Sequence, residues 1–146
     1  MNTPTRTTNR LHFEDLDPLR FEDLVYELLY RKQEWKRIEN WGKCGSDDGI
    51  DIHCEDKEGL KWFCQCKRYK SLQSVQVKEV VDKIVLSNKN TENSIILLVV
   101  ACEVSKKTCE FFQEYSLKKG FKEVIIWSSL TLEAELYNKH KELLET

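Results

Sequence analysis

The sequence predicts one α/β domain, a sandwich in which helices flank a central mixed β-sheet. The chain has 146 residues, the length of a single ordinary domain. Its residues are 40% hydrophobic and 33% charged, with only five glycines and two prolines, which is typical of an ordered protein with a core. Short apolar runs of strand periodicity alternate with longer runs of helical periodicity, and this alternation favours a sheet covered by helices.

The first half of the chain is expected to hold one helix and three strands. Asp17 and Pro18 are a helix start, because Asp accepts hydrogen bonds at an N-cap and Pro suits the first helical position. Apolar and polar residues alternate after Ile50, as they do in a strand. The expected elements are a helix over roughly 18–33 and strands over 35–41, 50–55 and 60–67.

The second half is expected to alternate helices with strands. Val75–Val85 has helical spacing despite its β-branched residues. The expected elements are a helix over 75–85, a strand over 94–101, a helix between Ser105 and Gly120, a strand over 124–127, and a last helix from Ser128 or Ser129 to Leu144. We expect residues 1–14 to be a flexible tail and residues 15–146 to be a single domain.

The six cysteines predict free thiols in a reducing compartment. They form no CxxC pair, and structural zinc sites need closely spaced ligand pairs. Residues 1–10 are polar and lack the apolar core of a secretory signal. The longest apolar run, 95–102, is too short to span a bilayer. We therefore expect a soluble, cytoplasmic protein without membrane contact.

Charge indicates a local basic surface and not a polycation. The net charge is −2, so bulk electrostatics do not indicate a nucleic-acid partner. Residues 59–77, however, contain four basic residues and no acid, and Lys78 follows. Such a stripe suits phosphate contacts, although a solvated basic surface is an equally ordinary explanation.

Polar residues at two neighbouring strands predict a metal site. Asp51 follows a Gly-containing loop at the start of an apolar strand, and it is the best candidate ligand. Gln65 and Lys67 share one face of the next strand, whereas Cys64 and Cys66 take the other. The side-chain oxygen of Gln65 and the backbone carbonyl of Cys66 could complete the oxygen ligands that Mg²⁺ prefers. Lys67 would then orient a water molecule and counter negative charge on a phosphate.

A further carboxylate is expected from the first helix. Glu22 and Glu27 are five residues apart, so they cannot lie on one helix face. Glu22 lies beside the apolar stripe that contains Phe21 and Val25, whereas Glu27 leans toward Arg31. We therefore favour Glu22 as the third acidic or amide side chain of the site.

Three strings of the sequence resemble one nuclease family. FEDLVYELL at 21–29, GSDDGIDI at 45–52 and QCKRYK at 65–70 are similar to the Mrr-type branch of the PD-(D/E)xK superfamily, relatives of archaeal Holliday-junction resolvases. The resemblance implies a restriction-endonuclease-like fold and an active site of Glu22, Asp51, Gln65 and Lys67 that uses Mg²⁺, with Mn²⁺ as an alternative. Asp47 matches an acid that the family often has before the catalytic one.

Two positions depart from the commonest pattern of the superfamily. Gln65 stands where many relatives have an acid, which removes a negative charge and favours a single metal ion. Asp48 replaces a glycine that is frequent in the family loop, and we assign it no role.

The sequence therefore predicts a Mg²⁺-dependent nuclease. The resemblance implies that it is a DNA endonuclease and the effector domain of a prokaryotic anti-phage defence or restriction system. Double-stranded DNA is the expected substrate, with contacts from Lys43, Ser46, Arg68, Lys70 and Lys78. Cutting both strands calls for two sites, which favours a homodimer or higher oligomer. A downstream sensor domain or a partner protein would supply the trigger. The alternatives are a catalytically inactive DNA- or partner-binding module of the same fold, and an RNA nuclease.

Overall fold

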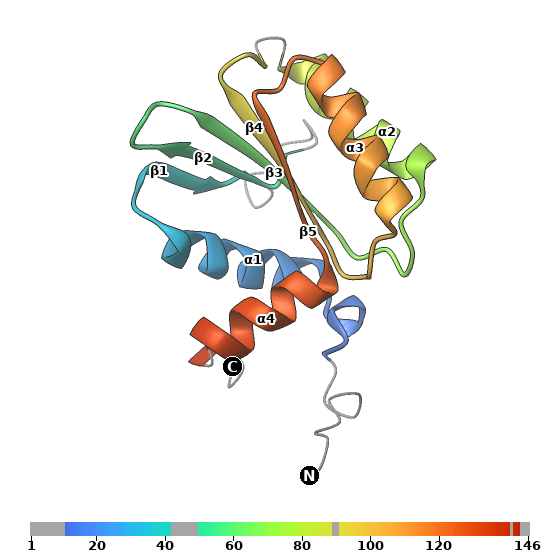
Figure 1. Ribbon diagram of the computed structural model, residues 1–146. Helices are drawn as coiled ribbons and strands as arrows, with labels where there is room; N and C mark the ends of the chain where they lie inside the picture. The colour runs from blue at the N-terminus through green and yellow to red at the C-terminus, as the bar shows by residue number, and fades with distance from the viewer. Residues whose placement is uncertain (1–10, 42–49, 89–90, 141, 144–146) are drawn as a thin grey trace.

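The computed structural model describes residues 11–41, 50–88, 91–140 and 142–143. They form a five-stranded sheet with helices on both sides (Figure 1). Along the chain the elements are η2 (Phe13–Asp15), α1 (Pro18–Lys32), β1 (Trp35–Asn40), β2 (Ile52–Asp56), β3 (Lys61–Lys67), α2 (Ser74–Ser87), β4 (Ser94–Val100), α3 (Lys106–Lys118), β5 (Glu123–Trp127) and α4 (Ser129–Lys139). The α/β fold with a mixed sheet is confirmed.

The sheet is half antiparallel and half parallel. Its strand order is β1-β2-β3-β4-β5, in which β1, β2 and β3 are antiparallel neighbours and β3, β4 and β5 are parallel. Parallel neighbours need crossover connections, and α2 and α3 provide them. The carboxyl ends of β3, β4 and β5 therefore meet at one edge of the sheet, where Lys67 lies opposite Val100.

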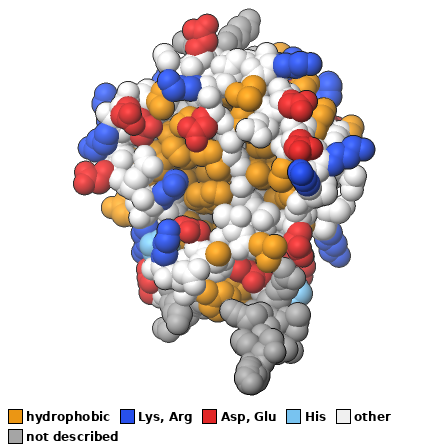
Figure 2. Space-filling model, in the orientation of Figure 1, with side chains coloured by type: hydrophobic (Ala, Val, Ile, Leu, Met, Phe, Trp, Pro, Cys, Tyr) orange, Lys and Arg blue, Asp and Glu red, His pale blue; other side chains and the backbone are white. Residues whose placement is uncertain are grey.

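Each face of the sheet has its own hydrophobic core. Helices α1 and α4 pack on the face that carries Cys64 and Cys66. Helices α2 and α3 pack on the face that carries Phe63. Strand β4 is buried at every position because helices cover it on both sides. Figure 2 shows acidic and basic side chains interspersed around a central hydrophobic area on one side of the molecule.

The segment before α1 belongs to the packed structure. Phe13, which lies in the expected tail, is only 3% exposed and packs in the same core as Phe21. The side chain of Asp17 accepts a hydrogen bond from the backbone N–H of Arg20, so Asp17 caps α1 as expected. Ordered packing therefore reaches back at least to Phe13, while residues 1–10 lie outside the described part.

Helix α2 forms where a helix was expected, whereas α4 ends earlier than expected. Helix α2 forms despite its β-branched residues because four apolar side chains on one side are buried against the sheet: Val77, Val80, Val81 and Ile84. The last helix ends at Lys139 with His140 as its C-cap, so the expected extension toward Leu144 is wrong for the described residues. Leu143 still packs against the core without being part of α4.

None of the described helices has the length and apolar character that crossing a membrane requires.

Asp56 organises the turn between β2 and β3, and its loss should destabilise the fold. Its Oδ1 accepts hydrogen bonds from the backbone N–H groups of Glu58 and Leu60, each at 2.9 Å. Its Oδ2 accepts another from the indole N–H of Trp62 at 3.1 Å, and the residue is only 5% exposed. We expect Asp56→Ala to lower the free energy of unfolding by about 2–3 kcal/mol, because buried donors are left without acceptors.

Urea denaturation followed by fluorescence measures this change. Lys57→Ala, an exposed substitution in the same turn, is the control and should shift stability by less than about 0.5 kcal/mol. Equal effects of the two substitutions would contradict the assigned role of Asp56.

Candidate active site

The site begins where β2 separates from β3. The backbone N–H of Asp51 still donates to the carbonyl of Cys64 at 2.8 Å, just beyond the regular pairing of Ile52 with Cys64. The next backbone N–H on that side of β3, that of Cys66, has no strand neighbour. It donates instead to Oδ2 of the Asp51 side chain at 2.7 Å. A carboxylate thus takes the place of a missing strand and is held at the edge of β3.

The backbone of β3 presents one carbonyl to this carboxylate. In a strand, the N–H and C=O of a residue point to the same side, and successive residues alternate. The carbonyl of Lys67 accepts from Ala101 N–H on the β4 side at 3.0 Å. The N–H of Cys66 points the other way, to Asp51, and the Cys66 carbonyl therefore also points to the Asp51 side. The Asp51 carboxylate and the Cys66 carbonyl therefore lie on the same side of β3.

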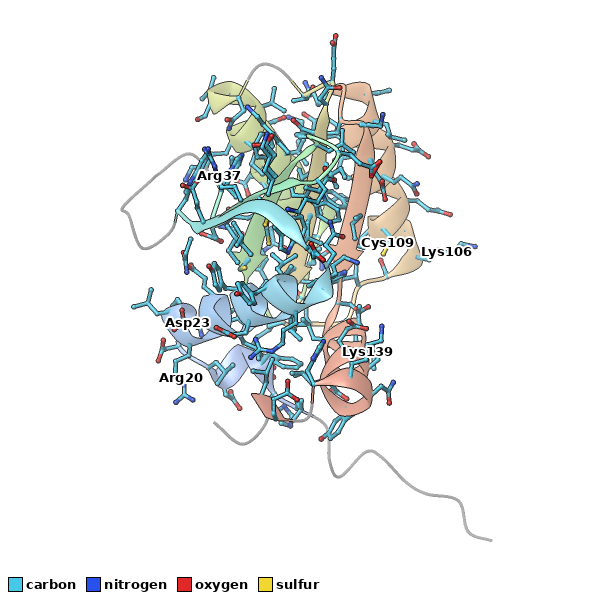
Figure 3. The ribbon with its side chains drawn as sticks, turned by 90° about the vertical axis from the view of Figure 1, so that its left-hand side faces the viewer. Arg20, Asp23, Arg37, Lys106, Cys109 and Lys139 are labelled. Carbon is cyan, nitrogen blue, oxygen red and sulfur yellow. The ribbon has the colours of Figure 1, made fainter. Side chains whose placement is uncertain are left out.

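Glu22 comes from α1, which packs on the sheet face that carries Cys64 and Cys66. The Glu22 side chain lies close enough to Asp51 to lower the pKa of the Asp51 carboxyl group, and the Oε1 atom of Glu22 is buried. By contrast, Arg20 and Asp23 of the same helix point away from the sheet (Figure 3). Glu27 forms an ion pair with Arg31, as the sequence indicated. Of the two glutamates that the sequence offered, Glu22 is the one near Asp51.

Glu22 and the residues at the end of β3 border a hollow, and Asp51 is not among its lining residues. Its volume is about 270 Å³, and its lining residues are Pro18, Phe21, Glu22, Cys66, Lys67, Arg68 and Tyr69. A larger hollow of about 400 Å³ lies between η2, α1 and α4, and leucines such as Leu16, Leu24 and Leu136 line much of it. None of the four expected catalytic residues lines that second hollow. We therefore place the site in the smaller, more polar one.

The electrostatics of the site centre on Asp51. Burial raises the pKa of its carboxyl group above the ordinary value, because the charged form loses water. The Cys66 N–H, the Lys67 ammonium and the contact with Glu22 act in the opposite direction and only partly offset the burial. Two carboxyl groups in contact cannot both be ionised without cost. A proton or a cation is needed to stabilise the pair.

The oxygen donors fit a hard divalent cation. Mg²⁺ is held by one or two carboxylates with carbonyl oxygens and water, and Glu22, Asp51 and the Cys66 carbonyl supply that chemistry. Within the described ranges, no cluster of three or more His, Cys, Asp or Glu side chains is placed to hold a metal. An ion at this place would need backbone or amide oxygens or water as further ligands.

Lys67 lies at the rim, and an aromatic ring accompanies it. Its Nζ is 5.9 Å from the ring centroid of Tyr69, a distance suited to a cation–π contact, and both residues line the hollow. Burial raises the pKa of the Tyr69 hydroxyl. Nothing in the sequence had marked Tyr69 as a site residue, because an aromatic residue in a basic loop carries no periodicity or motif of its own.

Gln65 is a buried residue of β3, and like Asp51 it is absent from the lining of the hollow. It is only 7% exposed, and it lies between Cys64 and Cys66, which pack toward α1. By strand alternation its side chain belongs to the opposite face, with Phe63. Its place as a metal ligand stays a prediction.

The expected DNA contacts are scattered in the structure. Lys70 is exposed beside the hollow, whereas Lys78 forms an ion pair with Asp82 at 3.0 Å and lies near the ring of Tyr115. Arg68 is half-buried, and its guanidinium donates to backbone carbonyls of the segment before α1. Lys43 and Ser46, like Asp47 and Asp48, lie outside the described residues.

The remaining candidates are His53 and the cysteines. His53 is 7% exposed and stacks on Trp41 with a centroid distance of 4.3 Å, and burial lowers the pKa of its imidazole. The five described cysteines are free thiols. Cys64 and Cys66 are buried in the core under α1.

The fold and the site together define an α/β domain with an acidic site at the end of parallel strands. The family model described as "Restriction endonuclease", that of the Mrr catalytic domain, matches residues 13–135. This match covers most of the chain, so the protein belongs to the Mrr-type family of restriction endonucleases and is a nuclease of that type. A comparison with curated proteins found no match.

The buried carboxylate of Asp51 should lower the stability of the metal-free protein. Its pKa is raised in the folded state, so its contribution favours folding below the ordinary value of 3.8 and is lost as pH rises through the folded pKa. Asn keeps an acceptor for the Cys66 N–H and has no charge to bury. We expect Asp51→Asn to melt at a higher temperature than the wild type at pH 7 in chelator, with a difference that shrinks toward pH 4. Melting of the variant at or below the wild-type temperature at pH 7 would contradict this account.

Proposed function

We propose that this domain cleaves DNA by metal-dependent hydrolysis of phosphodiester bonds, with Mg²⁺ as the ion and Mn²⁺ as a substitute. The observation that carries the proposal is that the Asp51 carboxylate accepts a hydrogen bond from the N–H of Cys66, a residue that lines one hollow together with Glu22 and Lys67. Membership of a restriction endonuclease family supports DNA as the substrate. The same family supports a role as nuclease effector in a prokaryotic defence or restriction system.

The residues of the site would divide the work among them. Glu22 and Asp51 would hold the ion, together with the Cys66 carbonyl and Gln65, and the Cys66 N–H would keep Asp51 oriented. When bound, the ion would lower the pKa of a bound water and neutralise charge on the phosphate. Lys67 would counter the charge that develops on the phosphoryl oxygens and position the attacking water. The ring of Tyr69 would restrict the Lys67 ammonium to the mouth of the hollow.

Duplex cleavage requires two such sites, and this requirement supports a homodimer or higher oligomer as the working form. We propose that the trigger for cleavage comes from a sensor domain or a partner protein. Metal binding should release protons, because burial raises the pKa of the Asp51 carboxyl group and a carboxylate must be ionised to hold the ion. Metal affinity should accordingly rise with pH in the acidic range.

Substitution of the site residues should abolish cleavage without unfolding the protein. We expect Asp51→Ala and Lys67→Ala each to slow plasmid cleavage in Mg²⁺ by about 100-fold or more, because each removes a charge that acts on the reacting phosphate or its ion. Cleavage rates from gel assays, with melting curves of each variant, measure both parts. Normal turnover by either variant would exclude the proposed site.

Asp23→Asn is the matched control, since Asp23 is an acid of the same helix that points away from the sheet (Figure 3). It should leave the cleavage rate within about twofold of the wild type, as expected for an exposed residue remote from the chemistry. Parallel reactions contain chelator, or structured RNA in place of plasmid. Cleavage of RNA alone would replace the proposal with an RNA nuclease. Absence of metal-dependent cleavage of both substrates would favour an inactive binding module.

A further inference from the structure

Arg68 makes contacts that differ from those of the other basic residues near the site. Its Nη1 donates to the backbone carbonyl of Leu16 at 2.7 Å and to that of Glu14 at 3.2 Å. Both acceptors precede α1 and are more than 50 residues from Arg68 in sequence. Arg68 directly follows Lys67 at the end of β3. One side chain therefore joins the end of the catalytic strand to the segment that leads into the helix of Glu22.

Helix α1 is thus attached to the sheet near both of its ends. Near its carboxyl end, the indole N–H of Trp35 in β1 donates to the carbonyl of Leu29 at 2.7 Å. Between the two attachments, Phe21 and Val25 are buried against the sheet. At the amino end, Arg68 holds Leu16, and α1 starts two residues later at Pro18. The position of Glu22 over Asp51 depends on this amino-terminal attachment, because Glu22 lies in the first half of the helix.

We propose that Arg68 is a positioning residue that fixes Glu22 against Asp51 and Lys67, and this inference rests on the function proposed above. The planar guanidinium carries several N–H donors in a fixed geometry, which suits it to two carbonyl acceptors at once. A lysine at this position would offer a flexible point charge instead. Arg68 and Glu22 line the same hollow, so a shift of the α1 amino end changes the site directly.

The competing role is a phosphate contact, which the position of Arg68 in the basic stripe had suggested. A phosphate contact acts only when DNA is present, and it weakens DNA binding with a reduced dependence on salt. A positioning residue also acts on the protein without DNA. The two roles therefore differ in measurements made on the metal-free and metal-bound protein alone.

Hydrogen exchange of the metal-free protein tests the attachment itself. We expect Arg68→Ala to speed amide exchange in residues 12–22, because local opening of the segment becomes easier. Arg37→Ala is the matched control: Arg37 is an exposed arginine of β1 at a different part of the molecule (Figure 3). Unchanged exchange of residues 12–22 in Arg68→Ala would overturn the inference, whether or not the protein binds metal or cuts DNA.

Calorimetric titration with Mn²⁺ in the absence of DNA tests the consequence for Glu22. We expect Arg68→Ala to weaken Mn²⁺ affinity by roughly 10-fold, a size typical of groups that orient metal ligands. Arg68→Lys should behave like Arg68→Ala, and it serves if the alanine variant fails to fold. In a Glu22→Gln background, Arg68→Ala should cause no further loss, because both changes act through the same ligand.

The outcomes separate this inference from the proposed function. Weakened Mn²⁺ binding in Arg68→Ala that disappears in the Glu22→Gln background supports the inference, even if no nucleic acid is cut. Unchanged Mn²⁺ affinity with weaker DNA binding overturns it in favour of a phosphate contact. Equal losses in the wild-type and Glu22→Gln backgrounds also overturn it, because Arg68 would then act on metal binding independently of Glu22.

Discussion

The hydrogen bond from the Cys66 N–H to the Asp51 carboxylate is the interaction on which the site depends. Strand β2 begins at Ile52, so the N–H of Cys66 in β3 lies beyond the paired part of β2. A buried backbone N–H without an acceptor is costly in a protein interior. Asp51 satisfies that donor at 2.7 Å and is held between the strands by the same bond. The fold thus fixes an acid beside a free strand edge, where a carbonyl oxygen points in the same direction. Other parts of the site are arranged around this fixed carboxylate.

The mixed sheet explains why three separate segments can meet there. In its parallel half, the carboxyl ends of β3, β4 and β5 lie at the same end of the sheet. In its antiparallel half, Asp51 directly precedes β2 and lies near the carboxyl end of β3. Helix α1 lies on one face and adds Glu22 from above the strands. The partly buried carboxylate of Asp51 opposes folding at neutral pH, as its raised pKa indicates. A bound cation would offset this cost, because its positive charge stabilises the ionised carboxylate.

Much of this arrangement could be predicted from the sequence, and the remainder has identifiable physical reasons. Periodicity distinguished Glu22 from Glu27, because the first lies beside the buried stripe of α1. Strand alternation predicted that Cys64 and Cys66 share one face of their strand. Sequence could not show that β2 would separate from β3, since that depends on packing. It also grouped Arg68 with the phosphate contacts, because basic residues look alike until their acceptors, here the Glu14 and Leu16 carbonyls, are known. The end of α4 was misplaced because Leu143 packs against the core although α4 ends at Lys139.

Anomalous diffraction from crystals of the protein soaked with Mn²⁺ tests the central claim most directly. The account predicts an anomalous peak within coordination distance of the Asp51 and Glu22 carboxylates and of the Cys66 carbonyl, lost in crystals of Asp51→Asn. An Asp51 carboxylate turned away from the Cys66 N–H, or a peak only at other residues under saturating Mn²⁺, would contradict it.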